Sequence, residues 1–302
     1  MQYKYLHSSE IDLQLWDSQL AKCPNRLVFA ESWYLKEACV NWAAIVNDDY
    51  TELLPFAINK KMGISYIYAP WAAPRLGCFS INNKCNLAKM LEAIPKKFKV
   101  IEIVNNGLVN ENPSAFKNTT RHNYIAHLNQ PYETLRANYH YKTRNILKKA
   151  EKVNLKVKSI GAQEILQLFK SNTGKSLSHI KEKNYLDIKN IIEKSLQLKF
   201  GEVLGAFDDE QNLLAAIFSL KKNDRIVNLF VASNEMGKKI GAMTFLVDHI
   251  IKSNSQTNTV LDFAGSSIRS IARFNERFGA QLETYSFLQN NNLPALLKLF
   301  KR

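Results

Sequence analysis

The chain has 302 residues and a formal net charge of +14, with 46% hydrophobic and 23% charged residues. These are ordinary values for globular proteins, so they exclude the disordered and fibrous classes, and the length predicts two domains. The sequence has no apolar run of about 18 residues and no signal-peptide pattern at Met1, so we expect a cytoplasmic protein with no membrane span.

The cysteines and histidines do not predict a metal site. Cys23, Cys39, Cys78 and Cys85 have no Cys-x-x-Cys spacing, and no histidine lies near them at the spacing of metal ligands. The six histidines are scattered along the chain. We therefore expect reduced, mainly structural cysteines and no bound metal.

The N-terminal half alternates between helical and strand patterns. Helices are predicted at 11–21, 32–40 and 86–96, and strands at 42–46, 52–58, 64–68, 99–104 and 122–128. Between the third and fourth of these strands, Ala69–Gly77 contains two prolines. Proline favours a rigid loop over a helix start that could hold a phosphate. A cofactor loop is therefore expected only in the C-terminal half.

A basic segment joins the two halves. As a helix, residues 139–152 place Arg144, Lys148 and Lys152 on one stripe and turn Ile146, Leu147 and Ala150 inward. Such a stripe suits a phosphate-bearing partner, which can be a nucleotide-linked substrate, RNA or an anionic lipid. The alternative is a solvated, lysine-rich helix face.

The C-terminal half has the most informative pattern. Strands are predicted at 156–160, 200–207, 213–220, 225–232 and 260–263, with a last strand ending near 288; helices are predicted at 163–169, 185–198, 240–251 and 268–278. Gly237–Ala242 is predicted as a glycine-containing loop that opens the third of these helices. A loop at a helix N-terminus directs free N–H groups and the helix dipole toward one anion.

This order of elements resembles the GNAT superfamily of acyltransferases. The segments Asp262–Gly265 and Ala272–Ala280, and the basic segment near Lys142–Ala150, are similar to motifs of its Fem-type branch, which includes peptidyltransferases of cell-wall precursors. The resemblance implies an α/β fold of two tandem GNAT-like lobes, each a mixed central sheet flanked by helices. The lobes are expected at 1–130 and 154–302, with a basic linker helix at 131–153.

The resemblance also implies a function. It predicts an enzyme that transfers an N-acyl or aminoacyl group from acyl-CoA or aminoacyl-tRNA to a small-molecule or peptide-like amine. Acyl-CoA would be a co-substrate, not a tightly bound cofactor. The implied donor-binding residues are Gly237, Lys238, Lys239, Ile240, Gly241 and Ala242. Neither glycine register matches the family's CoA loop fully, and residues 163–198 are too short for the paired-helix arm of some members, which leaves the donor open.

No hydrolase-like catalytic motif stands out, as GNAT chemistry allows, since the enzyme mainly orients amine and acyl donor. Asp262 is the first candidate for a general base, with His179 and Tyr285 as further candidates, and a turn or capping role is the alternative for Asp262. Tyr68, Trp71 and Arg75 are candidates for acceptor binding. The alternative function is a non-catalytic protein with a degenerate GNAT-like fold that binds an anionic ligand or nucleic acid. An opening between the central parallel strands beside Gly241 would favour the enzyme.

Overall fold

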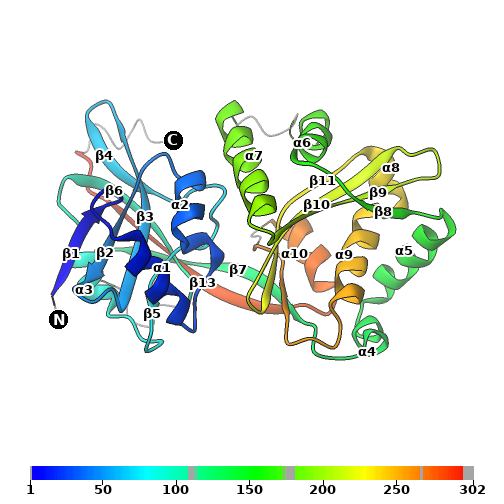
Figure 1. The fold of residues 1–302 in the computed structure, drawn as a ribbon, viewed down its shortest axis with the longest axis horizontal. Helices are drawn as coiled ribbons and strands as arrows, with labels where there is room; N and C mark the ends of the chain where they lie inside the picture. The colour runs from blue at the N-terminus through cyan, green and yellow to red at the C-terminus, as the bar shows by residue number, and fades with distance from the viewer. Residues whose placement is uncertain are drawn as a thin grey trace. The chain divides into compact units, whose positions relative to one another are not determined.

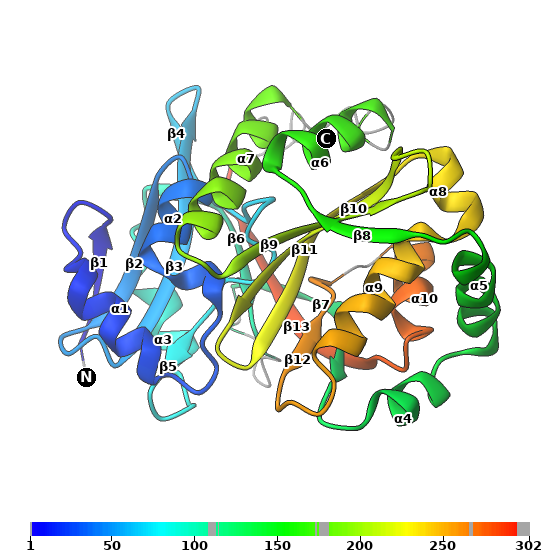
Figure 2. The same ribbon diagram turned by 45° about the vertical axis from the view of Figure 1, so that its right-hand side comes forward.

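The computed structural model describes residues 2–107, 113, 115–172, 174, 181–265 and 268–294 (Figures 1 and 2). The chain divides into two compact units. Unit 1 contains Met1–Arg121 and Thr284–Arg302, and unit 2 contains His122–Glu283. Each unit is described by itself below.

Unit 1 has a mixed sheet in the order β1-β2-β3-β4-β6-β13. Its strands are β1 (Tyr3–His7), β2 (Trp42–Asn47), β3 (Glu52–Lys61), β4 (Ile64–Tyr68), β5 (Phe79–Ser80), β6 (Phe98–Asn105) and β13 (Gln281–Asn291). The first four strands are antiparallel neighbours, β6 is parallel to β4, and β13 is antiparallel to β6. The short β5 pairs with β3 off this path.

Helices cover both faces of this sheet. They are α1 (Leu13–Lys22), the 3-10 turn η1 (Val28–Ala30), α2 (Ser32–Ala38) and α3 (Leu87–Glu92). Asp12 starts α1 because its carboxylate accepts the N–H groups of Gln14 and Leu15. Met90 and Leu91 of α3 pack on one face of the sheet. On the other face, Trp16 of α1 meets Trp42 edge to face.

Unit 2 has a sheet of the same design, in the order β8-β9-β10-β11-β12-β7. Its strands are β7 (Lys117–His127), β8 (Lys156–Ser159), β9 (Gly201–Phe207), β10 (Leu213–Lys222), β11 (Arg225–Ser233) and β12 (Val260–Asp262). Four strands again run antiparallel to their neighbours, β12 is parallel to β11, and β7 is antiparallel to β12. The buried run in β10 matches the predicted apolar strand.

The helices of unit 2 also form two layers (Figure 2). They are α4 (Tyr132–Ala137), α5 (Tyr141–Lys152), α6 (Ala162–Ser171), α7 (Glu182–Gln197), α8 (Glu235–Ile240), α9 (Ala242–Ser253) and α10 (Arg269–Glu276). α6 and α7 contact one face of the sheet, whereas α8 and α9 contact the other with α5 packed on α9. The predicted α/β class, with a mixed sheet flanked by helices in each half, is confirmed.

The last strand of each half pairs in the other half's sheet. β13, from the end of the chain, pairs with β6, while β7, which follows β6 in sequence, pairs with β12. This exchange explains why the unit boundaries fall within these two strands and differ from the predicted 130 and 153. The basic helix α5 lies within unit 2, because its Leu147 and Ala150 are buried in that unit's core.

Three segments differ from the predicted elements. The expected loop at Gly237–Ala242 is largely helical, because the Asn234 side chain accepts the Gly237 N–H and starts α8. The linker helix predicted at 131–153 is broken between α4 and α5, where His140 donates its backbone N–H to the Arg277 carbonyl and its side chain caps α5. β1 was not predicted; it is an edge strand paired to β2.

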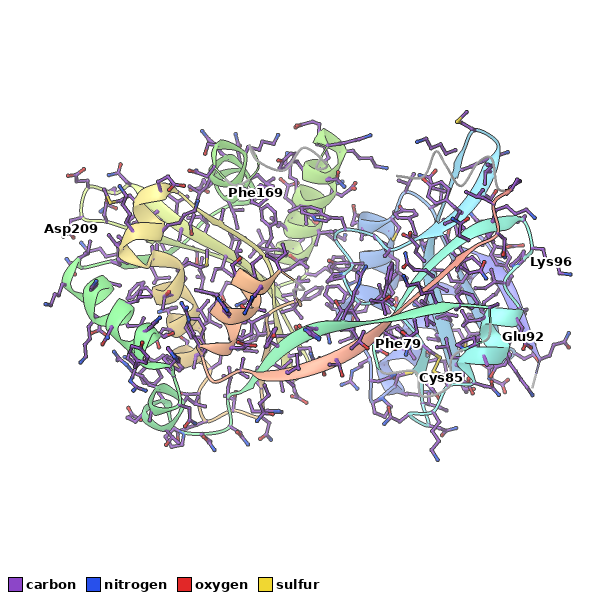
Figure 3. All side chains as sticks on the ribbon, turned by 180° about the vertical axis from the view of Figure 1, so that it is seen from behind. Phe79, Cys85, Glu92, Lys96, Phe169 and Asp209 are labelled. Atoms are coloured by element: carbon purple, nitrogen blue, oxygen red, sulfur yellow. A yellow bond between two sulfur atoms is a disulfide. The ribbon has the colours of Figure 1, made fainter. Side chains whose placement is uncertain are left out.

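The expectation of four reduced cysteines is wrong for two of them. Cys78 and Cys85 form a disulfide (Figure 3), whereas Cys23 and Cys39 are free and buried. Their spacing gave no signal, since the link depends on the chain turning back between β5 and α3. The disulfide lies entirely in unit 1.

The helices are too short or too polar to cross a lipid bilayer, within the part of the chain that the structure describes. A membrane-spanning helix requires about 20 apolar residues. Among the parts of the chain that the structure describes, no helix combines the necessary length and apolar character.

Candidate functional site

The unpaired end of β11 is the first element of the candidate site. β11 and β12 pair in parallel only from Arg225↔Val260 to Val227↔Asp262, where β12 ends. β11 continues to Ser233, so its residues 228–233 have no β12 neighbour. The parallel pairing of these two strands therefore stops at Val227 and Asp262.

A β-bulge lies at the start of this unpaired stretch. β10 pairs Phe218 with Phe230 but Ser219 with Asn228, so Leu229 is the extra residue of β11. A bulge redirects a backbone N–H and a side chain and is frequent beside active sites. The Ser219 hydroxyl hydrogen-bonds to the Asn228 side chain at 2.8 Å and anchors the bulge from the β10 side.

The side chains of this stretch show which face is open. Phe230 packs against Phe169 of α6, with ring centroids 4.5 Å apart. By strand alternation the next residue, Val231, points to the opposite sheet face, the one that α8 and α9 contact. Val231 is 45% exposed there. Val231 is therefore accessible on that face, whereas Ser233 at the end of the strand is buried.

The N-terminus of α9 is the second element. Gly241 precedes the helix with a φ of +81° and provides no side-chain cap. Phe245 is the first residue whose N–H bonds to Gly241. No hydrogen bond within the described residues is recorded for the N–H groups of Ala242, Met243 and Thr244. N–H groups in these positions of a helix can donate hydrogen bonds to a bound anion.

The glycines of the predicted donor loop have packing roles. The N–H groups of Gly237, Lys238 and Gly241 are all used inside or at the start of α8. A Cβ on Gly237 would lie 2.1 Å from the Leu214 carbonyl oxygen, and one on Gly241 would lie 2.1 Å from Ile146 of α5. Of the predicted loop, only its last residue, Ala242, offers a backbone donor without a recorded bond.

The two lysines of α8 differ. Lys238 forms an ion pair of 2.6 Å with Glu235 one turn away. This pair lowers the pKa of Glu235, through the hydrogen bond with Lys238. Lys239 is exposed and has no recorded ion-pair partner among the described residues. It is thus the lysine more available to a phosphate near α8.

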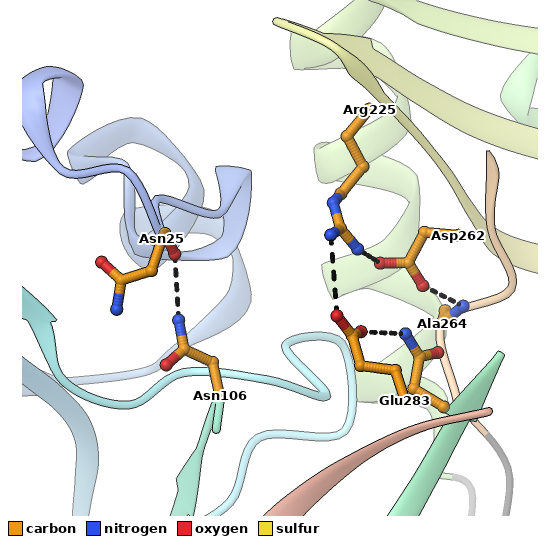
Figure 4. A network of polar contacts seen from close by, with 7 residues as sticks. Asn25, Asn106, Arg225, Asp262, Ala264 and Glu283 are labelled. Atoms are coloured by element: carbon orange, nitrogen blue, oxygen red, sulfur yellow. Dashed lines mark hydrogen bonds and ion pairs between the residues drawn. The ribbon is translucent and has the colours of Figure 1, made fainter. Parts of the chain in front are cut away.

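Asp262 is the buried member of an ionic cluster at the end of β12 (Figure 4). Its side chain is 0% exposed and forms an ion pair with Arg225, and it accepts the Ala264 N–H at 2.8 Å. Arg225 also lies 3.9 Å from Glu283, which accepts a hydrogen bond of 2.8 Å from Asn123. This environment suits an anchor for the β12 turn more than a general base in contact with a substrate.

Tyr285 and His179 are the other two candidates for a general base. Tyr285 belongs to unit 1, where it is buried and packs with Val104 and Phe287. A buried hydroxyl of this kind is shielded from an amine acceptor in solution. His179 lies outside the described residues.

The three candidates for acceptor binding are in unit 1. Tyr68 ends β4, with its ring centroid 5.9 Å from that of Tyr66 and the two rings tilted by 55°. Trp71 is 40% exposed in the loop that follows. Arg75 is only 1% exposed. Of the three, Trp71 offers the most surface to a ligand.

The basic stripe on α5 divides into two kinds of residue. Arg144 is half-buried and donates to the carbonyl oxygens of Ala137 and Tyr139, so it fastens the α4–α5 turn. Lys148 and Lys152 are exposed, as is their neighbour Lys149. The lysines are therefore free to meet a phosphate-bearing partner, whereas Arg144 also supports the fold.

Sequence reasoning missed the bulge at Leu229 and the partners of Asp262. Arg225 and Asp262 are 37 residues apart, and Asn123 and Glu283 are 160 apart, so no local pattern could pair them. A register shift likewise leaves no mark in one strand's own sequence. The uncapped α9 could have been inferred, because Gly241 cannot supply a capping oxygen.

A pocket of about 350 Å³ lies at the opposite end of α9. It is lined by His249, Ser253 and Asn254 of that helix, with Lys199 and Lys221 from the β9–β10 side. It contains none of the predicted site residues. We therefore do not assign the donor to it.

Comparison with solved structures shows a shared fold. The chain is similar to FemX (TM-score 0.66, 13% identity, covering 100% of both chains) and to a conserved protein of unknown function from Bacteroides thetaiotaomicron (0.62, 13%, covering 92% of this chain and 97% of that one). It is also similar to the C-terminal domain of a putative lysylphosphatidylglycerol synthetase from Agrobacterium fabrum (0.56, 10%, 97% and 95%). These likenesses confirm the predicted Fem-type, GNAT-like fold. No protein-family model and no curated protein sequence matches the chain.

Proposed function

We propose that the protein transfers an acyl or aminoacyl group from an activated donor to an amine, with the donor bound at the end of β11 and the start of α9. The observation that carries the proposal is the coincidence of three features in unit 2: the unpaired β11 end, the bulge at Leu229 and the uncapped α9. The shared fold with FemX and with a lysylphosphatidylglycerol synthetase domain supports transfer chemistry of this class.

Each feature has a part in the reaction. The first-turn N–H groups of α9 would bind the donor's anionic group, with Lys239 nearby on α8. A backbone N–H near the bulge would polarise the acyl carbonyl and stabilise the oxyanion that forms on attack. The amine nitrogen bonds to the carbonyl carbon, the bond to the donor's sulfur or ribose oxygen breaks, and the proton lost by the amine passes to the solvent or the leaving group.

Two donors fit this site. Acyl-CoA carries a pyrophosphate for the α9 N-terminus, and the Fem-type resemblance equally implies aminoacyl-tRNA. The exposed lysines of α5 favour a partner with many phosphates. The acceptor is an amine on a small molecule or peptide-like substrate.

The test is native mass spectrometry and calorimetry with acetyl-CoA and with aminoacyl-tRNA, followed by a transfer assay on a panel of amines. Val231→Trp should weaken donor binding at least about tenfold, because the indole would occupy the accessible face of β11 and an overfilled site typically costs about 1–3 kcal/mol. Leu186→Trp is the matched control, since Leu186 is 54% exposed on α7. Equal donor affinity in both folded variants would remove β11 from the site.

A second function is favoured by one observation. Ile146 occupies the space beside Gly241 that a bound pyrophosphate would approach. A protein that keeps the fold but only binds an anionic ligand or nucleic acid would show this closure. Ligand binding that depends on the α5 lysines but not on Val231, with no transfer to any amine, is the result that this alternative predicts.

A further inference from the structure

Unit 1 contains a group of three potential metal ligands that the proposed function does not use. The ligand atoms of Glu52, Cys78 and Cys85 all lie within 4.8 Å of one another. The two cysteines flank β5, and Cys85 immediately precedes Asn86, the N-cap of α3. Glu52 starts β3 and lies opposite Ser80 of β5. Figure 3 shows the disulfide beside the label of Cys85.

The Glu52 carboxylate is held in a way that suits a ligand. Its Oε2 atom accepts the Tyr3 hydroxyl at 2.9 Å and the Asn86 backbone N–H at 3.1 Å. Among the described residues, no contact is recorded for its Oε1 atom. Metal-bound carboxylates are commonly fixed by such hydrogen bonds to one oxygen while the other binds the ion.

We propose that the reduced form of this cluster is a zinc site made by Cys78, Cys85 and Glu52, and that the Cys78–Cys85 disulfide is its closed, metal-free form. A thiol reductant supplies two electrons and two protons to the disulfide and becomes a disulfide itself. The two thiols then release their protons as they bind Zn²⁺. Oxidation by a disulfide reverses the sequence and expels the ion.

Zinc fits these ligands better than other common ions. Two thiolates and one carboxylate match the tetrahedral sites of Zn²⁺, with Zn–S distances of about 2.3 Å and Zn–O distances of about 2.0–2.2 Å. Water can complete the fourth position. Mg²⁺ and Ca²⁺ prefer sites built from oxygen alone.

The two other cysteines provide an internal control. Cys23 and Cys39 are free and buried. Burial raises the pKa of the Cys23 thiol to about 11, so it stays protonated near neutral pH and is a poor ligand. Neither residue belongs to the cluster around Glu52.

The experiment titrates the full chain with Zn²⁺ in its reduced and oxidised forms. Competition with a chromogenic chelator and native mass spectrometry measure affinity and stoichiometry, and Co²⁺ substitution reports the thiolate ligands by their absorption. The reduced protein should bind one Zn²⁺ with a tetrahedral Co²⁺ spectrum, whereas the oxidised protein should bind none. This comparison needs no mutation, so misfolding of a variant cannot mimic the result.

Variants then assign the ligands. Cys78→Ser and Cys85→Ser should each abolish stoichiometric binding, and Glu52→Gln should weaken it at least about tenfold, as loss of a supported ligand does. Cys23→Ser and Glu92→Gln, which changes an exposed carboxylate on α3, should leave it unchanged. Equal zinc binding by oxidised and reduced protein, no binding by the reduced protein, or loss in the Cys23→Ser variant would overturn the proposal.

Discussion

The two units build the same crossover between parallel strands in opposite ways. In unit 1 the chain leaves β4 through Ala69–Gly77, a loop whose Ala73 and Arg75 are buried and whose Ala72 carbonyl accepts the Tyr34 hydroxyl. In unit 2 it leaves β11 through α8 and enters α9 without a side-chain cap. In the first crossover, buried residues of the loop pack against unit 1. In the second, the N–H groups at the start of α9 have no side-chain cap.

The two parallel strand pairs also differ in how far the first strand extends past its last paired residue. β4 pairs with β6 as far as Ile67, one position before its end at Tyr68. β11 extends from Asn228 to Ser233 beyond its last pair with β12. Unit 2, whose strand β11 extends further past the pairing, is therefore the unit in which we propose that the donor binds. The predictions below test this contrast.

The largest expected losses of folding free energy come from substitutions at the ends of β12 and β6. β12 ends at Asp262, whose charge is buried beside Arg225; β6 ends at Asn105, whose side chain accepts the Cys78 N–H at 3.1 Å. Asp262→Ala should cost about 2–4 kcal/mol, because it removes the buried partner of the Arg225 guanidinium, which is 27% exposed, and leaves the Ala264 N–H without its acceptor. Asn105→Ala should cost about 1–3 kcal/mol. Chemical denaturation measures both, and a smaller loss for Asp262→Ala would contradict the anchoring role.

Substitution of the glycines in the two crossovers should cause the next largest losses of stability. A Cβ on Gly77, which has a φ of +133°, would lie 2.6 Å from the Asn106 backbone nitrogen, so Gly77→Ala should cost roughly 3 kcal/mol. Gly241→Ala meets only the Ile146 side chain and should cost about 1–2 kcal/mol.

The control for the glycine pair is the double variant Gly241→Ala with Ile146→Ala, whose loss should be less than the sum of the two single losses. Additive losses would show that Ile146 is not the obstacle. For the same reason a Gly241→Val variant is expected to destabilise the fold, so Val231→Trp is the better probe of donor binding.

The α5 lysines test whether unit 2 meets a polyanion. Changing Lys148, Lys149 and Lys152 to Gln should lower affinity for tRNA and flatten its salt dependence, with a slope change of about one per lost phosphate contact. Stability should change by less than about 0.5 kcal/mol, because the three side chains are exposed. Changing Lys60, Lys61 and Lys84 of unit 1 alters the net charge equally and is the control. Identical salt slopes for the two triple variants would leave the solvated face as the explanation.

The smallest expected effect concerns Asp248 on α9. Burial raises its pKa, and its carboxylate accepts the Tyr132 hydroxyl at 2.8 Å. A carboxyl whose pKa is higher in the folded state stabilises the fold below its unfolded pKa, and this contribution is lost as the pH rises through the folded pKa. Asp248→Asn, which keeps an acceptor for Tyr132, should remove this decline. Thermal melts from pH 3.5 to 7 should show a flatter profile for the variant; a steeper decline would contradict the assignment.

Local sequence pattern predicted the elements that local forces determine. The apolar run at Leu213–Leu220 lies in β10, and the inward residues Leu147 and Ala150 of α5 are buried as expected. The proline-containing segment after Tyr68 is a loop and not the start of a helix, as its composition indicated.

What the sequence could not show depends on distant pairing. The exchange of β7 and β13 between the halves, the Arg225–Asp262 pair and the Cys78–Cys85 link each join residues whose neighbours carry no shared signal. The role of Gly241 could not be predicted either. The sequence does not distinguish a glycine that makes room for Ile146 from one that makes room for a phosphate.

Amide hydrogen exchange with and without a saturating donor tests the contrast between the crossovers most directly. Bound donor should slow exchange at residues 242–244 and 228–231 of unit 2, where we place its anionic group and its carbonyl. The loop Ala69–Gly77 of unit 1 should be unaffected. Protection of that loop instead, or unchanged exchange at the α9 N-terminus while calorimetry shows the donor to be bound, would contradict the assignment of the donor site to unit 2.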